Sequence, residues 1–165
     1  MNIKKIMFLT HAALIAALYV VLTMIANAMG LANHAIQIRF SEALTILPFF
    51  TPAAVPGLFV GCLLSNLLTG CAIPDIIFGS IATLLGALGT LYLRKTKWLA
   101  PLPPIAANTL IIPFILAYVY QFEGSLPYFM ITVGIGEIIS CGILGILLLN
   151  ILQKYAPRIF RMDNN

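Results

Sequence analysis

Long apolar stretches follow one another along almost the whole chain, separated by short connections that contain Pro, Gly or polar residues. A helix needs about 20 predominantly apolar residues to cross the hydrocarbon core of a bilayer. Of the 165 residues, 61% are hydrophobic and only 8% are charged, whereas an ordinary soluble domain carries about 25% charged residues. Such a chain cannot cover itself with a water-compatible surface. The sequence therefore predicts an all-α integral membrane protein.

Six segments meet the length requirement for membrane helices, two of them imperfectly. They cover residues 6–29, 36–50, 52–69, 74–93, 103–122 and 126–152. The second is short, and we expect it to be broken near Pro48. Because irregular backbone is not tolerated in contact with lipid, the short connections predict a single six-helix transmembrane domain over residues 1–165. No soluble catalytic or nucleotide-binding domain fits beside it, so any energy source must be a partner or a gradient.

The basic residues predict the orientation of the bundle, because Lys and Arg gather in cytoplasmic loops. With six crossings, eight of the nine basic residues fall on one side, which places both termini in the cytoplasm: Lys4, Lys5, Arg94, Lys95, Lys97, Lys154, Arg158 and Arg161. Arg39 is the exception, on the outer side at the start of the second segment. We interpret the net charge of +4 as a topology signal and expect no nucleic-acid partner.

Ionisable groups inside the membrane indicate where a function lies. An ionised side chain in hydrocarbon costs at least about 2.5–3.5 kcal/mol, so such groups pair, face the bundle interior or bind a ligand. Four of the five acidic residues belong to the outer half or the midplane of the predicted bundle. Glu137 lies about 16 Å from the outer surface at 1.5 Å per residue. It has no basic residue nearby in sequence, so it is the strongest candidate for a functional role.

Structural roles compete with ligand binding for the other polar residues. Arg39 and Glu42, at positions i and i+3, are placed to neutralise each other on a helix surface. Asp75 begins the fourth segment, where a carboxylate caps backbone amides, and we favour that role for it. Asn66 is equally suited to bonding a neighbouring helix and to binding a ligand. We expect Asn108 to bond a neighbouring helix.

Two rows of small residues run along the first segment, Ala12-x-x-x-Ala16 and Ala13-x-x-x-Ala17. Small residues at this spacing let helices approach closely, although the rows alone do not identify a partner.

The sequence shows no pattern for metal or covalent chemistry. His11 and His34 lack a second ligand at i+3 or i+4, and Cys62, Cys71 and Cys141 lack metal-ligand spacing. We therefore expect no metal and no cofactor. No nucleophile and base stand together, so the sequence does not favour an enzyme.

Three stretches together resemble the QueT family of queuosine-precursor transporters, and the resemblance covers nearly the whole chain. They are IQIRFSEALTILPFFTPAAVPG at 36–57, GCLLSNLLTG at 61–70 and PDIIFGSIATLLGALGT at 74–90. The resemblance implies a substrate-binding S component of an energy-coupling factor (ECF) transporter in the bacterial cytoplasmic membrane. Such a subunit captures its ligand outside the cell and associates with a transmembrane T component and two cytoplasmic ATPases. S components use an Ala-x-x-x-Ala pattern in the first helix to contact the T component, which Ala12, Ala13, Ala16 and Ala17 match.

The ligand that the resemblance implies is a deazaguanine such as queuine or its aminomethyl precursor. Its guanine-like edge offers two N–H donors to a carboxylate, its carbonyl needs a donor, its flat ring needs an aromatic neighbour, and an amine-bearing arm needs a second acid. Which carboxylate takes which end stays open. Candidate ligand-binding residues are Glu137, Glu42, Arg39, Asn66, Phe40, Asp75, Tyr118 and Tyr128.

Three other functions compete with this interpretation. An S component for a different vitamin or nucleobase-like solute is the closest, because many polar heterocycles need the same residue types. An intramembrane enzyme using Glu42 and Glu137 as acid and base is more distant. A structural or assembly subunit would have no use for buried acids.

Overall fold

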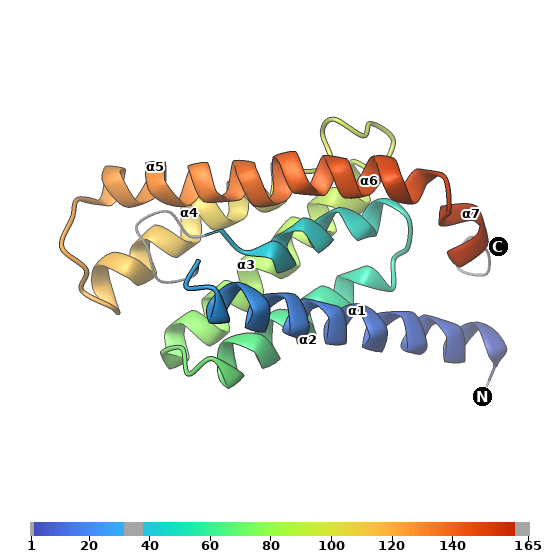
Figure 1. The fold of residues 1–165 in the computed structure, drawn as a ribbon, viewed down its shortest axis with the longest axis horizontal. Helices are drawn as coiled ribbons and strands as arrows, with labels where there is room; N and C mark the ends of the chain where they lie inside the picture. The colour runs from blue at the N-terminus through green and yellow to red at the C-terminus, as the bar shows by residue number, and fades with distance from the viewer. Residues whose placement is uncertain (1, 32–37, 161–165) are drawn as a thin grey trace.

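The computed structural model describes residues 2–31 and 38–160, and every regular element in these two ranges is helical. In chain order the elements are α1 (Ile3–Ala28), the 3₁₀ helix η1 (Phe40–Phe49), α2 (Ala54–Leu68), α3 (Ile73–Tyr92), α4 (Leu102–Tyr118), α5 (Leu126–Glu137), the π-helical η2 (Ile138–Leu144), α6 (Gly145–Gln153) and the short α7 (Ala156–Ile159). Figure 1 shows that α5, η2 and α6 form one uninterrupted rod.

Three helices in the described ranges are long and apolar enough to cross a membrane: α1, α3 and the continuous helix Leu126–Gln153. The apolar helices η1, α2 and α4 are shorter. With 15 and 17 residues, α2 and α4 extend about 22–25 Å at 1.5 Å per residue, less than the hydrocarbon thickness of about 30 Å. The all-helical, membrane-type fold is therefore confirmed, and the number of six crossings stays a prediction.

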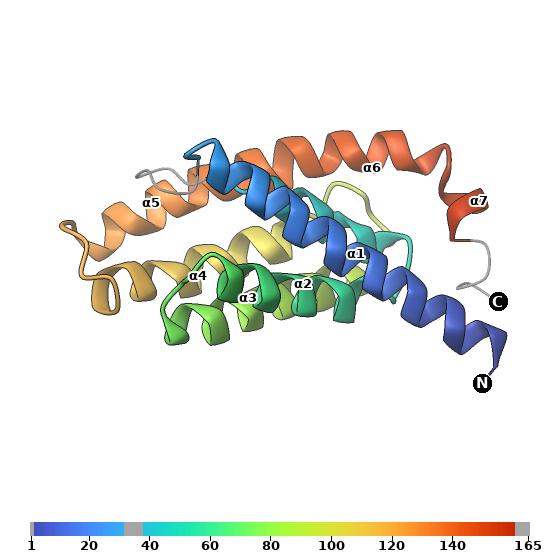
Figure 2. The ribbon, with the colours of Figure 1, turned by 60° about the horizontal axis from the view of Figure 1, so that its bottom comes forward.

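The first turn of α1 and the short α7 lie at the same end of the bundle, as Figures 1 and 2 both show. The α2–α3 and α4–α5 connections lie at the opposite end. An even number of crossings requires this arrangement. The assignment of the α7 end to the cytoplasm stays a prediction.

The 3₁₀ helix η1 runs through the middle of the bundle and contacts α1, α2, α3, α6 and η2. All its residues from 41 to 48 are buried. The expected break at Pro48 is wrong, because η1 continues through Pro48 and ends at Phe49. Proline removes one backbone donor, but its fixed φ near −65° suits a 3₁₀ helix. The helix begins at Phe40, and the expected start at residue 36 lies outside the described residues.

A cluster of buried apolar side chains joins η1 to its neighbours around Tyr19 of α1, Ile46 of η1, Leu58 of α2 and Leu149 of α6. These four side chains are at most 1% exposed. Because η1 is surrounded in this way, its polar side chains are held in fixed positions inside the bundle.

Glycines allow α1 and α2 to pack with their backbones close together. A Cβ atom at Gly57 would lie 2.6 Å from the carbonyl oxygen of Ala12, and one at Gly61 would lie 3.1 Å from Cα of Ala16. One of the two alanine rows of α1 is therefore used inside the bundle. In the same way, a Cβ atom at Gly86 of α3 would lie 2.6 Å from Cα of Pro104 in α4.

Candidate ligand-binding site

A cavity of about 290 Å³ lies at the end of the bundle that carries the α2–α3 and α4–α5 connections. Its volume is near the lower end of the range of about 300–1,000 Å³ found for small-molecule sites. Side chains from α1, α2, α3, α4 and the connections line it: Thr23, Ala26, Asn27, Arg39, Asn66, Thr69, Gly70, Cys71, Asp75, Ile112, Leu116, Tyr120 and Phe122.

Asp75, in the first turn of α3, is 4% exposed and lines this cavity. Its Oδ2 atom accepts a hydrogen bond from the Tyr120 hydroxyl at 2.8 Å. The Ala72 amide donates to the same hydroxyl oxygen at 3.1 Å. The other carboxylate oxygen of Asp75, Oδ1, is buried and has no hydrogen-bond partner within the described ranges.

The favoured capping role of Asp75 is therefore not what the structure shows. The N-cap residue of α3 is Ala72, and no side chain caps this end of the helix. The Tyr120 hydroxyl oxygen accepts the hydrogen bond from the Ala72 amide. The Asp75 side chain instead bonds Tyr120 and lines the cavity.

Arg39 and Asn66 line the same cavity. Arg39 precedes η1 in an extended conformation, and its backbone amide donates to Oγ of Ser140 at 3.2 Å. Asn66 of α2 is 2% exposed. A Cβ atom at Gly79 would come within 3.2 Å of both the Asn66 amide nitrogen and Asp75 Oδ1, so the glycine leaves room for both groups.

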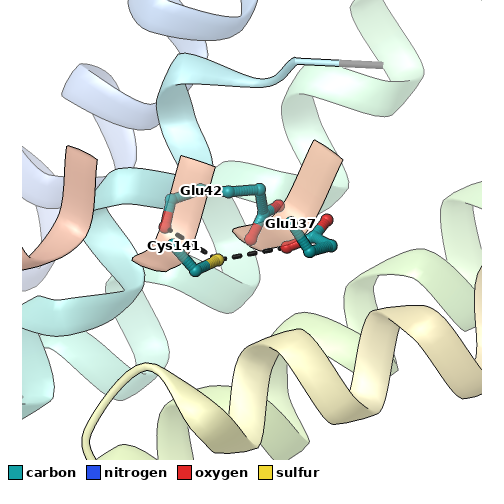
Figure 3. A group of neighbouring side chains, drawn as sticks. All are labelled: Glu42, Glu137 and Cys141. Carbon is teal, nitrogen blue, oxygen red and sulfur yellow. Dashed lines mark hydrogen bonds between the residues drawn. The ribbon is translucent and has the colours of Figure 1, made fainter. Parts of the chain in front are cut away.

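Two further acids, Glu42 of η1 and Glu137 of α5, form a buried inner acid pair. They are 2% and 8% exposed. Tyr19 donates a short hydrogen bond to Oε1 of Glu42. Figure 3 shows the Cys141 thiol beside both residues: Sγ donates to Glu137 Oε2 at 3.1 Å and to the Glu42 backbone carbonyl at 3.5 Å. One ligand-type atom from each of the three residues lies within 4.8 Å of the others.

The inner acid pair is next to the cavity. A pocket of about 10 Å³ is lined by Arg39, Asn108, Ile112, Val133 and Glu137, and Arg39 and Ile112 also line the large cavity. The Asn108 amide, from a residue that is 3% exposed, lies close to both carboxylates. Oε2 of Glu42 is nevertheless buried without a hydrogen-bond partner of good geometry among the described residues. Arg39 thus lines both the cavity with Asp75 and the small pocket with Glu137.

The π-helical segment η2 explains how Glu137 and Cys141 reach η1. Short π segments widen a helix and are frequent at functional sites. This one begins directly after Glu137 and turns Ser140 and Cys141, each 1% exposed, toward η1. Ser140 accepts the Arg39 amide, and Thr45 donates to the Cys141 sulfur at 3.4 Å.

The structure brings five of the eight candidate ligand-binding residues together: Arg39, Asn66 and Asp75 on the cavity, and Glu42 and Glu137 beside it. The three candidate stacking residues lie elsewhere. Tyr118 is 72% exposed and stacks on Phe114, and Tyr128 is 47% exposed and packs against Phe129. Phe40 is half-buried at the start of η1 and lines neither cavity.

Tyr120 and Phe122 are the aromatic residues among the cavity-lining residues that the sequence analysis missed. The fifth segment was expected to extend to residue 122, but α4 ends at Tyr118. The chain then turns through Gln121 at a positive φ of 52°. Because of this turn, the rings of Tyr120 and Phe122, stacked with centroids 5.6 Å apart, line the cavity. The polar run from Gln121 to Gly124 was the signal for an earlier helix end.

The four alanines of α1 divide between two surfaces. Ala12 and Ala16 face the glycines of α2. Ala13 and Ala17 are exposed, and Ala13 lies in a shallow apolar hollow with Ile6, Leu9, Thr10 and Leu14.

An apolar helical bundle with buried acids around a small cavity is typical of membrane proteins that bind or move a small solute. Comparison with known proteins agrees. The sequence matches the QueT transporter family over residues 9–154, and the chain belongs to this family. The resemblance seen in the sequence is thereby confirmed, and the family is one of transporters.

One curated relative is the queuosine precursor transporter QueT of Lactococcus lactis subsp. cremoris (strain MG1363). It is 36% identical over 86 residues, which are 52% of this chain and 50% of the relative. The matched part of the chain thus spans about half the length of this relative. No solved structure shows significant similarity to the chain.

Proposed function

We propose that this chain is the substrate-binding S component of an ECF transporter, which binds queuine or a related deazaguanine from outside the cell. ATP hydrolysis by partner subunits then drives uptake. The protein would cross the bacterial cytoplasmic membrane several times, with both termini in the cytoplasm.

Reporter fusions at the C-terminus test this orientation. A fluorescent protein fused there should fold and fluoresce, whereas an alkaline phosphatase that is active only after export should be inactive. The opposite pattern would contradict this orientation.

The observation that carries the proposal is a small cavity with an unpaired Asp75 oxygen in a chain of the QueT transporter family. A carboxylate oxygen accepts more than one hydrogen bond, so Asp75 can receive the two N–H groups of a guanine-like edge while it keeps Tyr120. Arg39 and Asn66 supply donors for the ring carbonyl. The stacked rings of Tyr120 and Phe122 offer an aromatic wall for a flat heterocycle.

The exposed row of Ala13 and Ala17 supports the proposed contact with a T component. Small side chains let a partner helix approach closely. The parallel row of Ala12 and Ala16 is already occupied by α2, so we propose that the outward row makes the contact.

Thermal unfolding of the purified chain in detergent tests the ligand. Queuine and its aminomethyl precursor should raise the unfolding midpoint at micromolar concentration, because a ligand at 100 times its Kd stabilises the folded state by about 2.7 kcal/mol. Guanine and a panel of vitamins serve as controls. If no deazaguanine changes the midpoint, the ligand assignment is wrong. Stabilisation by a vitamin or another nucleobase-like solute would favour the alternative, an S component for that solute.

A further inference from the structure

The site contains more acids than bases. Asp75, Glu42 and Glu137 are all less than a tenth exposed, whereas Arg39 is the one basic side chain among the described residues that line the two cavities. Buried ionised groups are costly unless an opposite charge compensates them. One cation cannot balance three carboxylates. A ligand with a positive charge would reduce this imbalance.

Two of the three acids, Glu42 and Glu137, converge in one place. Arg39 lines both the large cavity, beside Asp75, and the small pocket, beside Glu137. Oδ2 of Asp75 accepts a hydrogen bond from the Tyr120 hydroxyl, and Oδ1 has no hydrogen-bond partner among the described residues. The inner acid pair is in contact with the polar but uncharged groups of Tyr19, Cys141 and Asn108. The hydrogen bonds described for the side chains of Glu42 and Glu137 thus come from uncharged groups.

We propose that the inner acid pair binds a positively charged amine of the ligand, and that Asp75 binds the uncharged N–H edge of the ring. This inference rests on the proposed function of the cavity as a ligand site. An ammonium group has three donors and no acceptor. Oε2 of Glu42 is buried and lacks a partner among the described residues, and the Glu137 carboxylate lines the pocket beside the cavity. The arm of the ligand would pass Arg39 to reach them.

A metal ion is the other cation that this cluster could hold, since Glu42, Glu137 and Cys141 converge. The hydrogen bonds favour the amine. Metal ligation requires the thiolate, which would add a third negative charge next to the two acids that Cys141 contacts. In addition, Oε1 of Glu42 already accepts a hydrogen bond from the Tyr19 hydroxyl.

Two ligands with the same ring test the proposal on the purified full chain. Aminomethyl-deazaguanine carries an ammonium group, and cyano-deazaguanine carries a neutral nitrile at the same ring position. We expect calorimetry to give an at least tenfold lower Kd for the amine, since hydrogen bonds to charged groups contribute about 1.5–3 kcal/mol. Equal affinities, or tighter binding of the nitrile, would overturn the charge assignment and leave the proposed function intact. If neither compound binds, the proposed function itself fails.

The variant Glu137→Gln tests whether the amine of the ligand binds at the inner acid pair. It should weaken binding of the aminomethyl compound about tenfold and change binding of the nitrile less than about twofold. The same result for Glu42→Gln would support binding of the amine by both acids. The control is Glu123→Gln, at an exposed acid near the same end of the bundle.

An equal loss of affinity for both ligands in Glu137→Gln would overturn the assignment. Stabilisation by Zn²⁺ that disappears in Cys141→Ser would overturn it in favour of a metal site. The wild-type comparison remains decisive if a variant does not fold.

Discussion

The Asp75 carboxylate is fixed by one hydrogen bond through Oδ2, and its second oxygen, Oδ1, is buried without a hydrogen-bond partner among the described residues. A buried polar atom without a partner costs about 1–3 kcal/mol. A ligand that donates to this oxygen recovers that cost when it binds. Tyr120 keeps the carboxylate in place from a connection that follows α4, so the side chain does not have to be ordered at the moment of binding.

Asp75→Asn should weaken deazaguanine binding about tenfold or more. The amide has nearly the same shape as the carboxylate, but it lacks the charge and can turn an NH₂ group toward the N–H donors of the ring. Calorimetry on the purified variant measures the change. Glu123→Gln makes the same chemical change at an exposed site and should leave the Kd unchanged. An unchanged Kd in Asp75→Asn would remove this residue from the ligand site.

Single residues were partly predictable from the sequence. Glu42, Glu137 and Asn66 could be selected because polar groups in an apolar segment need a compensating partner. Tyr120 could not, because an aromatic residue at the end of an apolar segment suits a membrane interface as well as a cavity. Its role depends on the turn at Gln121 and on Asp75, which is far away in sequence.

At the scale of elements, the close packing of α1 on α2 helps to position Tyr19 next to Glu42. The glycines of α2 bring α1 close enough for the Tyr19 hydroxyl to reach Glu42 in the central 3₁₀ helix. The sequence predicted a short and irregular second segment. It did not predict that this segment is a 3₁₀ helix buried on all sides, because that depends on the helices around it.

Gly57→Ala should destabilise the bundle, by about 1–3 kcal/mol for an overpacked contact. The added Cβ atom would lie 2.6 Å from the backbone oxygen of Ala12, so α1 and α2 must move apart. The unfolding midpoint in detergent should fall. Gly134→Ala in α5 is the matched control, because its Cβ atom would be 3.5 Å from the nearest atom and alanine is the better helix former. Equal midpoints for the two variants would show that the α1–α2 contact is not limiting.

At the scale of the whole molecule, the bundle has at one end a cavity lined by both polar and apolar residues, and it has an exposed small-residue row on α1. The acids from η1, α3 and α5 meet near this cavity although up to 95 residues separate Glu42 from Glu137 in the sequence. The outward row of Ala13 and Ala17 faces away from α2. An S component of this kind would bind its ligand and its partner subunit through different surfaces.

Ala13→Leu should reduce copurification with a coexpressed T component and its ATPases and leave the ligand Kd unchanged. The larger side chain would fill the surface on which a partner helix packs closely. Ala106→Leu makes the same change at an exposed alanine of α4 and should have no effect on assembly. Copurification of Ala13→Leu at the wild-type level would contradict the proposed contact. Loss of assembly in both variants would point to a general effect of added bulk.

The sequence by itself determined the all-helical membrane fold, the approximate ends of its segments and the family, because apolar length and local motifs are properties of continuous stretches of chain. Tertiary structure decided which polar groups meet. Helix rotation, the turn after α4 and the π segment after Glu137 turn Asp75, Arg39 and the inner acid pair toward one site. These features depend on contacts between distant segments, such as Tyr120 with Asp75 and Tyr19 with Glu42, and no local pattern records them.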